Sequence, residues 1–439
     1  MRVSIWTQSA GCWTPGHAGR AQRGIREGPV SPSHLILSAA RSYMGECDTP
    51  ISTAELRRLT TLGAALFGLF LCIPLGAQPA ENEPARPRLE AGADTNDWGS
   101  YHELGVHLMF TQPQKAADAF YWASRLDPGE AGPLYYQWRA LWMSNPALRR
   151  RYFRGDRKAL ASVFAQRANA MRLRATFRDP FVLAIGDPAA LERGPSTDRT
   201  REYLLKRPDD VGLWMYQAIN FYRIGGFDST IAQIKQAIAA LDRIERKAPT
   251  RVYESREFFE YAIGAAYMSL GDPKAAREAF ERSVSENVSF YPARAAIAAI
   301  AWSEGSDIET AVREYELATE LNPSDGFLRQ EYGATLLVAR RFDEAVTQLE
   351  RAIEMEPHFA NIYLNLGIAY DHLGKDQESL GAYRRFVALA PRRMQPRITR
   401  AKARVEELTQ LVAATTKSTA GRLDTLAQTG ATAKKEPPR

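Results

Sequence analysis

The residue types that do chemistry in proteins are few and scattered in this chain of 439 residues. All three cysteines, Cys12, Cys47 and Cys72, lie near the start, so the rest of the chain has no thiol for a nucleophile, a disulfide or a zinc site. His102 and His107 point about 140° apart on a helix and cannot share a ligand. The sequence therefore predicts no catalytic residue, no metal site and no cofactor.

Motifs for phosphate binding or nucleophilic catalysis are missing from the sequence as well. It has no glycine-rich phosphate loop, no G-x-S-x-G and no H-E-x-x-H. Carboxylates such as Glu278 and Glu281 fall on the polar side of a helical pattern. With 45% hydrophobic and 25% charged residues, the composition is that of an ordinary globular protein. We therefore expect a protein that binds partners and does no covalent chemistry.

The elements that would carry such binding repeat along the chain with a period of 34 residues, because Pro323, Pro357 and Pro391 are spaced by 34 and 34. Two short amphipathic helices per period explain the pattern, with a small residue such as Gly333 or Gly367 where they cross. One such pair cannot bury its apolar stripes alone, so successive pairs must stack. Matching positions precede each proline: Ala311, Tyr315 and Ala318; Ala345, Leu349 and Ala352; Ser379, Tyr383 and Phe386.

This pattern resembles the tetratricopeptide repeat, W-x2-L-G-x2-Y followed by A-x3-F and P. Further copies begin near Tyr101, Trp214 and Ile263. The resemblance implies an all-α, right-handed superhelical solenoid of helix hairpins over 98–391, in which 130–209 is irregular because little of it aligns. The best single copy contains Tyr363, Leu366, Gly367, Tyr370, Gly374 and Pro391.

The residues after the last repeat predict two further segments. We expect 392–413 to be a capping helix that covers the last exposed apolar surface of the solenoid. Residues 414–439 have no large apolar residue after Leu426 and predict a disordered basic tail. The capping face would consist of Ala401, Val405, Leu408 and Val412.

The start of the chain predicts export. Two arginines precede an apolar run at 62–73, which is followed by the helix breaker Pro74 and by small residues around Ala77. A secretory signal peptide needs this order, because its core enters the lipid as a short helix and the peptidase requires small side chains. We expect translation to begin at Met44 and cleavage to fall near Ala77.

Two alternatives to a cleaved signal remain open. The uncharged stretch 59–80 is long enough for an uncleaved membrane anchor, and Cys72 is a candidate for lipid attachment. A cleaved signal and an uncleaved anchor would both place most of the chain outside the cytoplasm, either in the periplasm or anchored to a membrane. The resulting segments are 1–43, an unstructured extension or a stretch upstream of the true start; 44–77, a signal peptide or membrane anchor; and 78–97, a flexible linker.

The first helices of the repeats would line an inner wall, onto which two or three positions of each helix face. The wall is mainly apolar, with aromatic and methionine side chains, and this favours a groove for an apolar or amphipathic segment of a protein partner. The alternative is that helices of the same chain cover part of it. The expected groove residues are Met215, Ile219, Tyr222, Tyr261, Met268, Ile300, Gln330, Leu337, Leu364, Ile368 and Asp371.

A basic cluster is the second candidate surface. Residues 148–180 hold ten Arg or Lys against two Asp, a local charge of +8, with aromatic residues between them. The cluster predicts contact with anionic lipid or an acidic protein surface rather than nucleic acid, unless it is simply a solvated arginine-rich face. Its residues include Arg149, Arg150, Arg151, Arg154, Arg157, Lys158, Arg172 and Arg174.

These observations together predict an exported or membrane-anchored scaffold for protein–protein interaction. The alternative is a subunit, catalytic or not, of a cell-envelope enzyme complex in which 130–209 is an inserted segment. The two readings differ in whether 130–209 folds as further helix pairs or as a body with its own pocket. The sequence names neither the partner nor the biological process, because one fold serves many functions.

Overall fold

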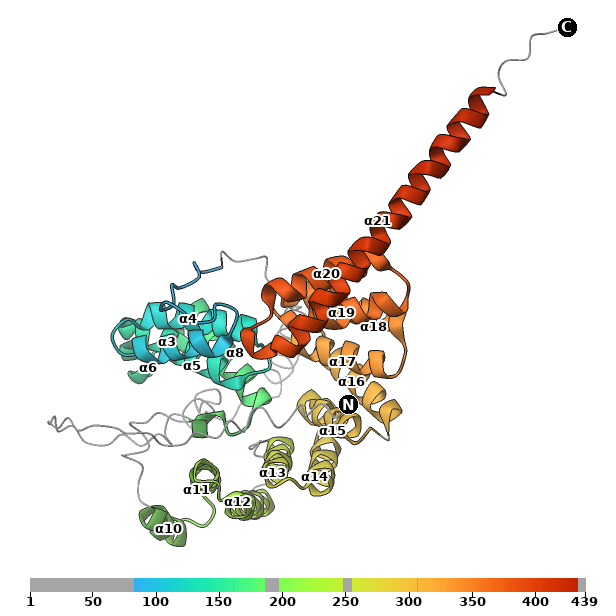
Figure 1. Cartoon of the computed structure of the whole chain (residues 1–439). Helices are drawn as coiled ribbons and strands as arrows, with labels where there is room; N and C mark the ends of the chain where they lie inside the picture. Colours follow the sequence, from blue (N-terminus) through green and yellow to red (C-terminus); the bar gives the residue numbers. More distant parts are fainter. Residues whose placement is uncertain (1–82, 161, 186–196, 248–254, 306, 433–439) are drawn as a thin grey trace, which may run out of the picture. The chain divides into compact units, whose positions relative to one another are not determined.

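A computed structural model describes residues 83–160, 162–185, 197–247, 255–305 and 307–432 (Figure 1). Every regular element in these ranges is a helix, which confirms the predicted all-α fold. The predicted extension at 1–43 and the predicted signal or anchor at 44–77 lie outside the described residues. Within the described ranges, no helix has the length and apolarity needed to span a membrane.

The chain divides into two compact units. The first unit includes Asp179–Asp307, and the second unit includes the described residues 83–178 and 308–432. The division falls between the two helices of the repeat that ends at Pro323. The helices over 98–391 are therefore divided between the two units, and each unit is described by itself.

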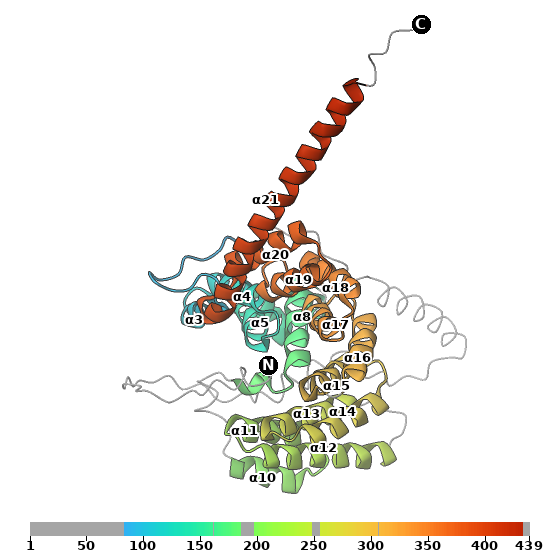
Figure 2. The same cartoon turned by 45° about the vertical axis from the view of Figure 1, so that its right-hand side comes forward.

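In the first unit, helices that follow one another pack as hairpins (Figure 2). α11 packs on α12 and α13 packs on α14, while contacts of α12 with α13 and of α14 with α15 join the hairpins into a stack. This is the stacking of the tetratricopeptide solenoid that the 34-residue period predicts. The elements are η1 (Val182–Ile185), α10 (Thr197–Lys206), α11 (Val211–Arg223), α12 (Phe227–Lys247), α13 (Arg256–Leu270), α14 (Pro273–Glu286) and α15 (Tyr291–Glu304).

The second unit combines helices from both ends of the described chain. α3, α4, α5 and α8 form one set of packed neighbours, and the helices from α16 to α21 pack successively in another. The elements are α3 (Trp98–Leu108), α4 (Pro113–Leu126), α5 (Ala131–Ser144), α6 (Pro146–Phe153), α7 (Arg157–Leu160), α8 (Val163–Arg178), α16 (Ile308–Leu321), α17 (Gly326–Val338), α18 (Phe342–Met355), α19 (Ala360–His372), α20 (Asp376–Leu389), η2 (Arg392–Met394) and α21 (Gln395–Thr432).

Local sequence sets the ends of these helices. The carboxylates of Asp210, Asp272 and Asp325 each accept a hydrogen bond from the backbone N–H three residues on, at 3.1, 3.0 and 3.2 Å. Such capping bonds satisfy amides that have no partner inside the helix. Gly271 ends α13 and Gly374 follows α19 with φ of 75° and 68°, values that glycine adopts without the strain of a side chain.

Small residues lie where the two helices of a hairpin cross, as the repeat pattern predicts. A Cβ atom on Gly264 would lie 2.4 Å from the ring of Phe280, and one on Gly367 would lie 2.9 Å from the ring of Tyr383. Both distances are shorter than van der Waals contact. The aromatic side chain of the second helix therefore packs directly on the backbone of the first.

The irregular stretch 130–209 is mainly helical. α5 packs against both α4 and α8, and α10 packs against α11. The short helices α6 and α7 lengthen the connection between α5 and α8. This longer connection removes the 34-residue spacing, and it explains why the stretch does not align with the repeats although its helices continue their packing.

The segment 83–97, within the predicted flexible linker, makes specific contacts in the second unit. The guanidinium of Arg86 lies 5.0 Å from the ring centre of Trp122, and the backbone N–H of Arg392 donates a hydrogen bond to the Asp94 carboxylate at 2.6 Å. The structure differs from the prediction here because charged residues that a linker would expose to water find partners on α4 and η2.

The predicted capping helix is present as α21, which packs against α20. It begins at Gln395 and continues to Thr432, so it extends into the predicted disordered tail 414–439 instead of ending at residue 413. The packed face of α21 consists of Ile398, Ala401, Val405, Leu408 and Val412.

The close approach at Gly264 leads to a stability prediction. Gly264→Leu should lower the free energy of unfolding by about 1–3 kcal/mol, because the new side chain must displace Phe280. The control Gly381→Ala lies on an exposed face of α20 where a Cβ meets nothing within 4 Å, and it should raise stability by about 0.5–1 kcal/mol. Urea unfolding followed by circular dichroism measures both; an unchanged midpoint for Gly264→Leu would contradict the packing described.

Candidate functional site

The inner wall of the first unit is formed partly by α11. Met215, Ile219 and Tyr222 of this helix are partly buried. All three pack against the buried apolar cluster that contains Phe181. Phe181 belongs to a segment that precedes the first hairpin of this unit, so the chain itself occupies this part of the predicted groove.

The occupying segment is 179–185, which ends in the single turn η1. The Phe181 ring stacks on the Tyr222 ring with the centroids 4.0 Å apart and the planes inclined by 14°. Phe181 and Val182 have no exposed surface. These two side chains are therefore completely enclosed, although the segment is not part of a helix pair.

Asp179 lies at the beginning of this segment and is partly buried. Its carboxylate accepts a hydrogen bond from the backbone N–H of Phe181 at 2.8 Å. Burial raises the pKa of Asp179 to about 6. Burial also raises the pKa of Tyr222, and the neighbouring Asp179 carboxylate raises it further. The segment thus combines an apolar contact with a carboxyl group that closes its turn.

On the remaining wall of the first unit, Met268 is more exposed than Tyr261 and Ile300. Tyr261 is buried, with its ring 5.5 Å from that of Phe280 and 5.6 Å from that of Phe290. Ile300 is only 1% exposed. Met268, near the end of α13, is partly buried and keeps accessible surface. Of these residues, Met268 is the one that a partner can reach without a change in packing.

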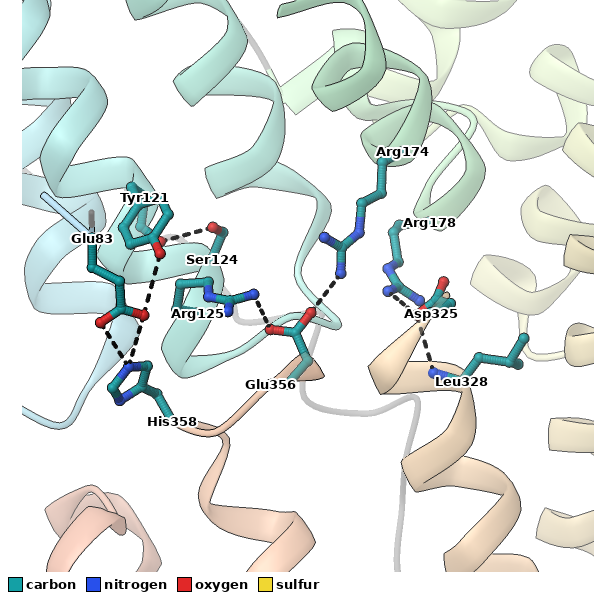
Figure 3. Close-up of polar contacts among 10 residues, drawn as sticks. All are labelled: Glu83, Tyr121, Ser124, Arg125, Arg174, Arg178, Asp325, Leu328, Glu356 and His358. Carbon is teal, nitrogen blue, oxygen red and sulfur yellow. Dashed lines mark hydrogen bonds and ion pairs between the residues drawn. The ribbon is translucent and has the colours of Figure 1, made fainter. Parts of the chain in front are cut away.

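In the second unit, α8 contacts the wall formed by α17. Arg178 donates a hydrogen bond to the Asp325 carboxylate at 2.7 Å, and its guanidinium lies 4.6 Å from the ring centre of Phe327 (Figure 3). The predicted groove residue Gln330 is buried, whereas Leu337 is partly buried. Helix α8 of the same chain thus contacts the beginning of this wall, at Asp325 and Phe327.

Glu356 forms a second ionic contact beside the first. Its two carboxylate oxygens accept hydrogen bonds from Arg125 at 2.7 Å and from Arg174 at 2.9 Å, and the Glu356 side chain is only 3% exposed (Figure 3). Arg125 belongs to α4 and Arg174 to α8, whereas Glu356 lies in the turn between α18 and α19. Breaking a buried ion pair of this kind is costly because a desolvated charge is left behind.

Two acidic groups near this contact have pKa values that are shifted in opposite directions. For Asp325, burial favours the neutral form, but the charges of Arg178 and Arg174 hold the pKa below its ordinary value. For Glu331 on α17, burial raises the pKa to about 7, although Arg178 opposes the shift. Asp325 is therefore a stable anionic partner for arginine, whereas Glu331 changes charge near neutral pH.

The wall at the last repeat lies against the capping helix. Leu364 and Ile368 pack against the apolar cluster that α20 and α21 form. The Asp371 carboxylate accepts hydrogen bonds from Nε and Nη2 of Arg404 on α21 at 3.1 and 3.2 Å. These three predicted groove residues contribute to the packing of the cap.

Part of the predicted basic surface is engaged within the chain. Arg174 binds Glu356, and Arg151 binds Asp156 at 2.8 Å. Arg149 and Arg172 are partly buried, and burial lowers the pKa of Arg172. The side chain of Arg157 lies outside the described part of the structure.

The exposed part of the basic surface is smaller than the sequence predicts. It follows α6 and the residues up to α7, and it includes an aromatic side chain, because Phe153 is 63% exposed. On α6, Phe153 lies three and four residues after two arginines and so shares a face with them. The exposed basic side chains are Arg150, Arg151, Arg154 and Lys158, and Arg151 is paired with Asp156.

His102, one of the few residues with ligand chemistry, lies inside a hairpin. Its ring contacts those of Trp98, Phe120 and Tyr136 at 5.7, 5.4 and 5.3 Å. Burial lowers the pKa of His102 to about 4, so the ring is neutral at physiological pH. Over the described ranges, no group of three His, Cys, Asp or Glu side chains has a geometry that could hold a metal ion.

Sequence reasoning missed the residues that cover the walls. Phe181 and Arg178 lie in the stretch that does not align with the repeats, so the period assigns them no position. Asp325 and Glu356 lie next to repeat prolines, where a turn is expected, but their arginine partners are more than a hundred residues away. An unusual acid beside a repeat proline was the only available signal.

Comparison with known proteins identifies the repeats. Sequence models described as tetratricopeptide repeat match residues 333–393 and 261–287. An uncharacterised protein of Haemophilus influenzae is 26% identical over 97 residues, which make up 22% of this chain and 54% of the relative. The chain thus spans about half the length of this relative.

Solved structures with a similar arrangement include two proteins. YrrB, described as a TPR protein with an unusual peptide-binding site, is 17% identical, and the match covers 46% of this chain and 97% of YrrB with a TM-score of 0.39. MamA is 19% identical, and the match covers 39% of this chain and 93% of MamA with a TM-score of 0.33.

The ionic contact at Glu356 leads to a second stability prediction. Glu356→Ala should lower the free energy of unfolding of the second unit by roughly 1–3 kcal/mol, since Arg125 and Arg174 both lose their partner. The control Glu354→Ala removes an exposed carboxylate two residues away and should change stability by less than about 0.5 kcal/mol. Chemical unfolding of both variants tests this, and equal effects would contradict a special role for Glu356.

Proposed function

Because this chain belongs to the tetratricopeptide repeat proteins, we propose that it is a scaffold for protein–protein interaction that performs no catalysis. In this proposal it binds an apolar peptide or helix of its partner on the inner wall of the first unit. The observation that supports the proposal is the stacking of Phe181, from a segment outside the hairpins, on Tyr222 of α11. A partner segment of similar chemistry would find the same contacts.

The helical packing of 131–178 supports a scaffold rather than a catalytic insertion. α5 and α8 pack on one another and on the neighbouring hairpin, as further repeats would. A role as a non-catalytic subunit of a cell-envelope complex agrees equally well with this packing. It is a special case of the proposed scaffold.

We also propose that the chain is exported. The support is the order of arginines, apolar run and small residues within 44–77. N-terminal sequencing of the mature protein from its native host should find a start near Gln78. A mature chain that retains residues 1–43 would contradict export by this signal, whereas a start at Met44 would favour the uncleaved anchor.

Partner binding on the wall is tested with a charge substitution. Met268→Lys should weaken capture of wall-dependent partners from an envelope fraction by at least about tenfold, because a bound apolar segment would bury the new ammonium group. Val288→Lys is a matched control, since Val288 is 65% exposed in the loop between α14 and α15 of the same unit.

Quantitative mass spectrometry of the captured proteins gives the readout, and circular dichroism verifies that both variants are folded. Partners lost with Met268→Lys and retained with Val288→Lys support the wall as the binding surface. An identical set of partners for both variants and the wild type would contradict it.

The exposed basic surface around α6 supports a second candidate function, attachment to an anionic lipid or acidic protein surface. Arg150, Arg154 and Lys158 are exposed beside Phe153. Basic side chains attract anionic lipid, while an exposed aromatic ring can enter the interface between headgroups and chains. The combination favours a lipid surface over a purely electrostatic protein contact.

This second candidate predicts salt-sensitive binding to vesicles. The double variant Arg150→Glu, Arg154→Glu should lose most cosedimentation with vesicles rich in phosphatidylglycerol, because each basic residue near the surface contributes about 1 kcal/mol. The control Lys235→Glu, Lys274→Glu changes the net charge equally at exposed sites of the first unit. Equal loss in both variants would point to net charge alone, and no binding by the wild type would exclude a lipid surface.

A further inference from the structure

The 179–185 segment differs from the rest of the first unit in its relation to the repeats. It precedes α10 and α11, it belongs to no hairpin, and its only regular structure is the single turn η1. α11 already packs on α12, its partner in the hairpin. The segment is therefore an addition to a wall that the hairpins already form.

The segment contacts a residue that the repeat register directs toward a partner. Tyr222 is expected in the groove from its spacing, and its ring stacks on that of Phe181. Met215 and Ile219, the other expected groove residues of α11, pack on the apolar cluster to which Phe181 belongs. A ring contact at a wall position, rather than at the crossing between helices, is what we expect of a ligand.

We propose that the 179–185 segment is an internal ligand of the α11 wall, and that a partner displaces it with a segment of the same chemistry. The inference rests on the proposed function of the wall and adds to it the kind of peptide that the wall prefers. That peptide carries an acidic residue, then proline, then an aromatic residue followed by an aliphatic one, as in Asp179-Pro180-Phe181-Val182.

Each part of this pattern has a contact that explains it. The aromatic ring stacks on Tyr222 at 4.0 Å, and the aliphatic side chain that follows is fully buried. The acidic residue closes a turn by accepting a hydrogen bond from the Phe181 N–H at 2.8 Å. Proline restricts the backbone between them, which lowers the entropy lost on binding.

Attachment to the same chain makes the internal ligand a strong competitor. A short tether gives an effective concentration in the millimolar range, so a free peptide with equal contacts binds only to the small open fraction. Its apparent dissociation constant is then the intrinsic constant divided by that fraction. Weakening the internal contact should therefore strengthen binding of the free peptide.

The test uses a fluorescein-labelled synthetic peptide with the sequence of residues 178–185, titrated into the full chain and followed by fluorescence anisotropy. Phe181→Ala should bind this peptide at least about tenfold more tightly than the wild type. Phe153→Ala serves as the matched control, because it removes an exposed phenylalanine of the second unit, and should bind like the wild type. A peptide with alanine in place of phenylalanine should bind to none of them.

If Phe181→Ala does not fold, Phe181→Leu carries the same test, since it keeps apolar bulk but loses the ring stacking on Tyr222. It should bind the peptide several-fold more tightly than the wild type. Adding Tyr222→Ala to either variant should abolish the gain.

Equal affinity of the folded Phe181 variant and the wild type, or a gain that survives Tyr222→Ala, would overturn the internal ligand. The proposed function would be unaffected if partners captured from the envelope fraction still depended on Met268. Conversely, loss of that dependence with a retained peptide gain would overturn the scaffold proposal alone.

Discussion

The structure depends on one constraint: a hairpin of two short helices buries only one face and must place the other against a neighbour. The 34-residue spacing satisfies this constraint, because each hairpin presents a small residue at its crossing and large residues to the next. The same close contact occurs in both units: Gly264 lies under the ring of Phe280 in the first unit, and Gly367 lies under the ring of Tyr383 in the second. Where the series ends, α21 covers the last hairpin.

The same constraint explains why the inner walls carry apolar side chains that need a cover. In the first unit the cover at α11 is the 179–185 segment, and in the second unit it includes α8. The two covers differ in chemistry. Phe181 makes an apolar stack, whereas Arg174 and Arg178 bind carboxylates in the turns of the repeats. A stack without charge is the easier one for an apolar partner to replace, since its removal leaves no desolvated ion.

Sequence periodicity was sufficient for the class of fold, the hairpins from 211 onwards and the position of the cap. Periodicity was sufficient here because each hairpin needs a small residue where its two helices cross and a proline after its second helix, and both lie within the same 34 residues. It did not reveal the covers of the walls, because contacts such as Arg174 with Glu356 join residues far apart in the chain and obey no period. The linker contact of Asp94 with Arg392 was missed for the same reason.

The occupied wall at α11 is tested most directly by amide hydrogen exchange of the free chain and of the chain with excess partner peptide. The account predicts that Phe181 and Val182 are protected in the free chain and lose protection when the peptide binds, while the α12 amides stay protected. Rapid exchange of Phe181 and Val182 in the free chain, or protection that persists when the peptide is bound, would contradict it.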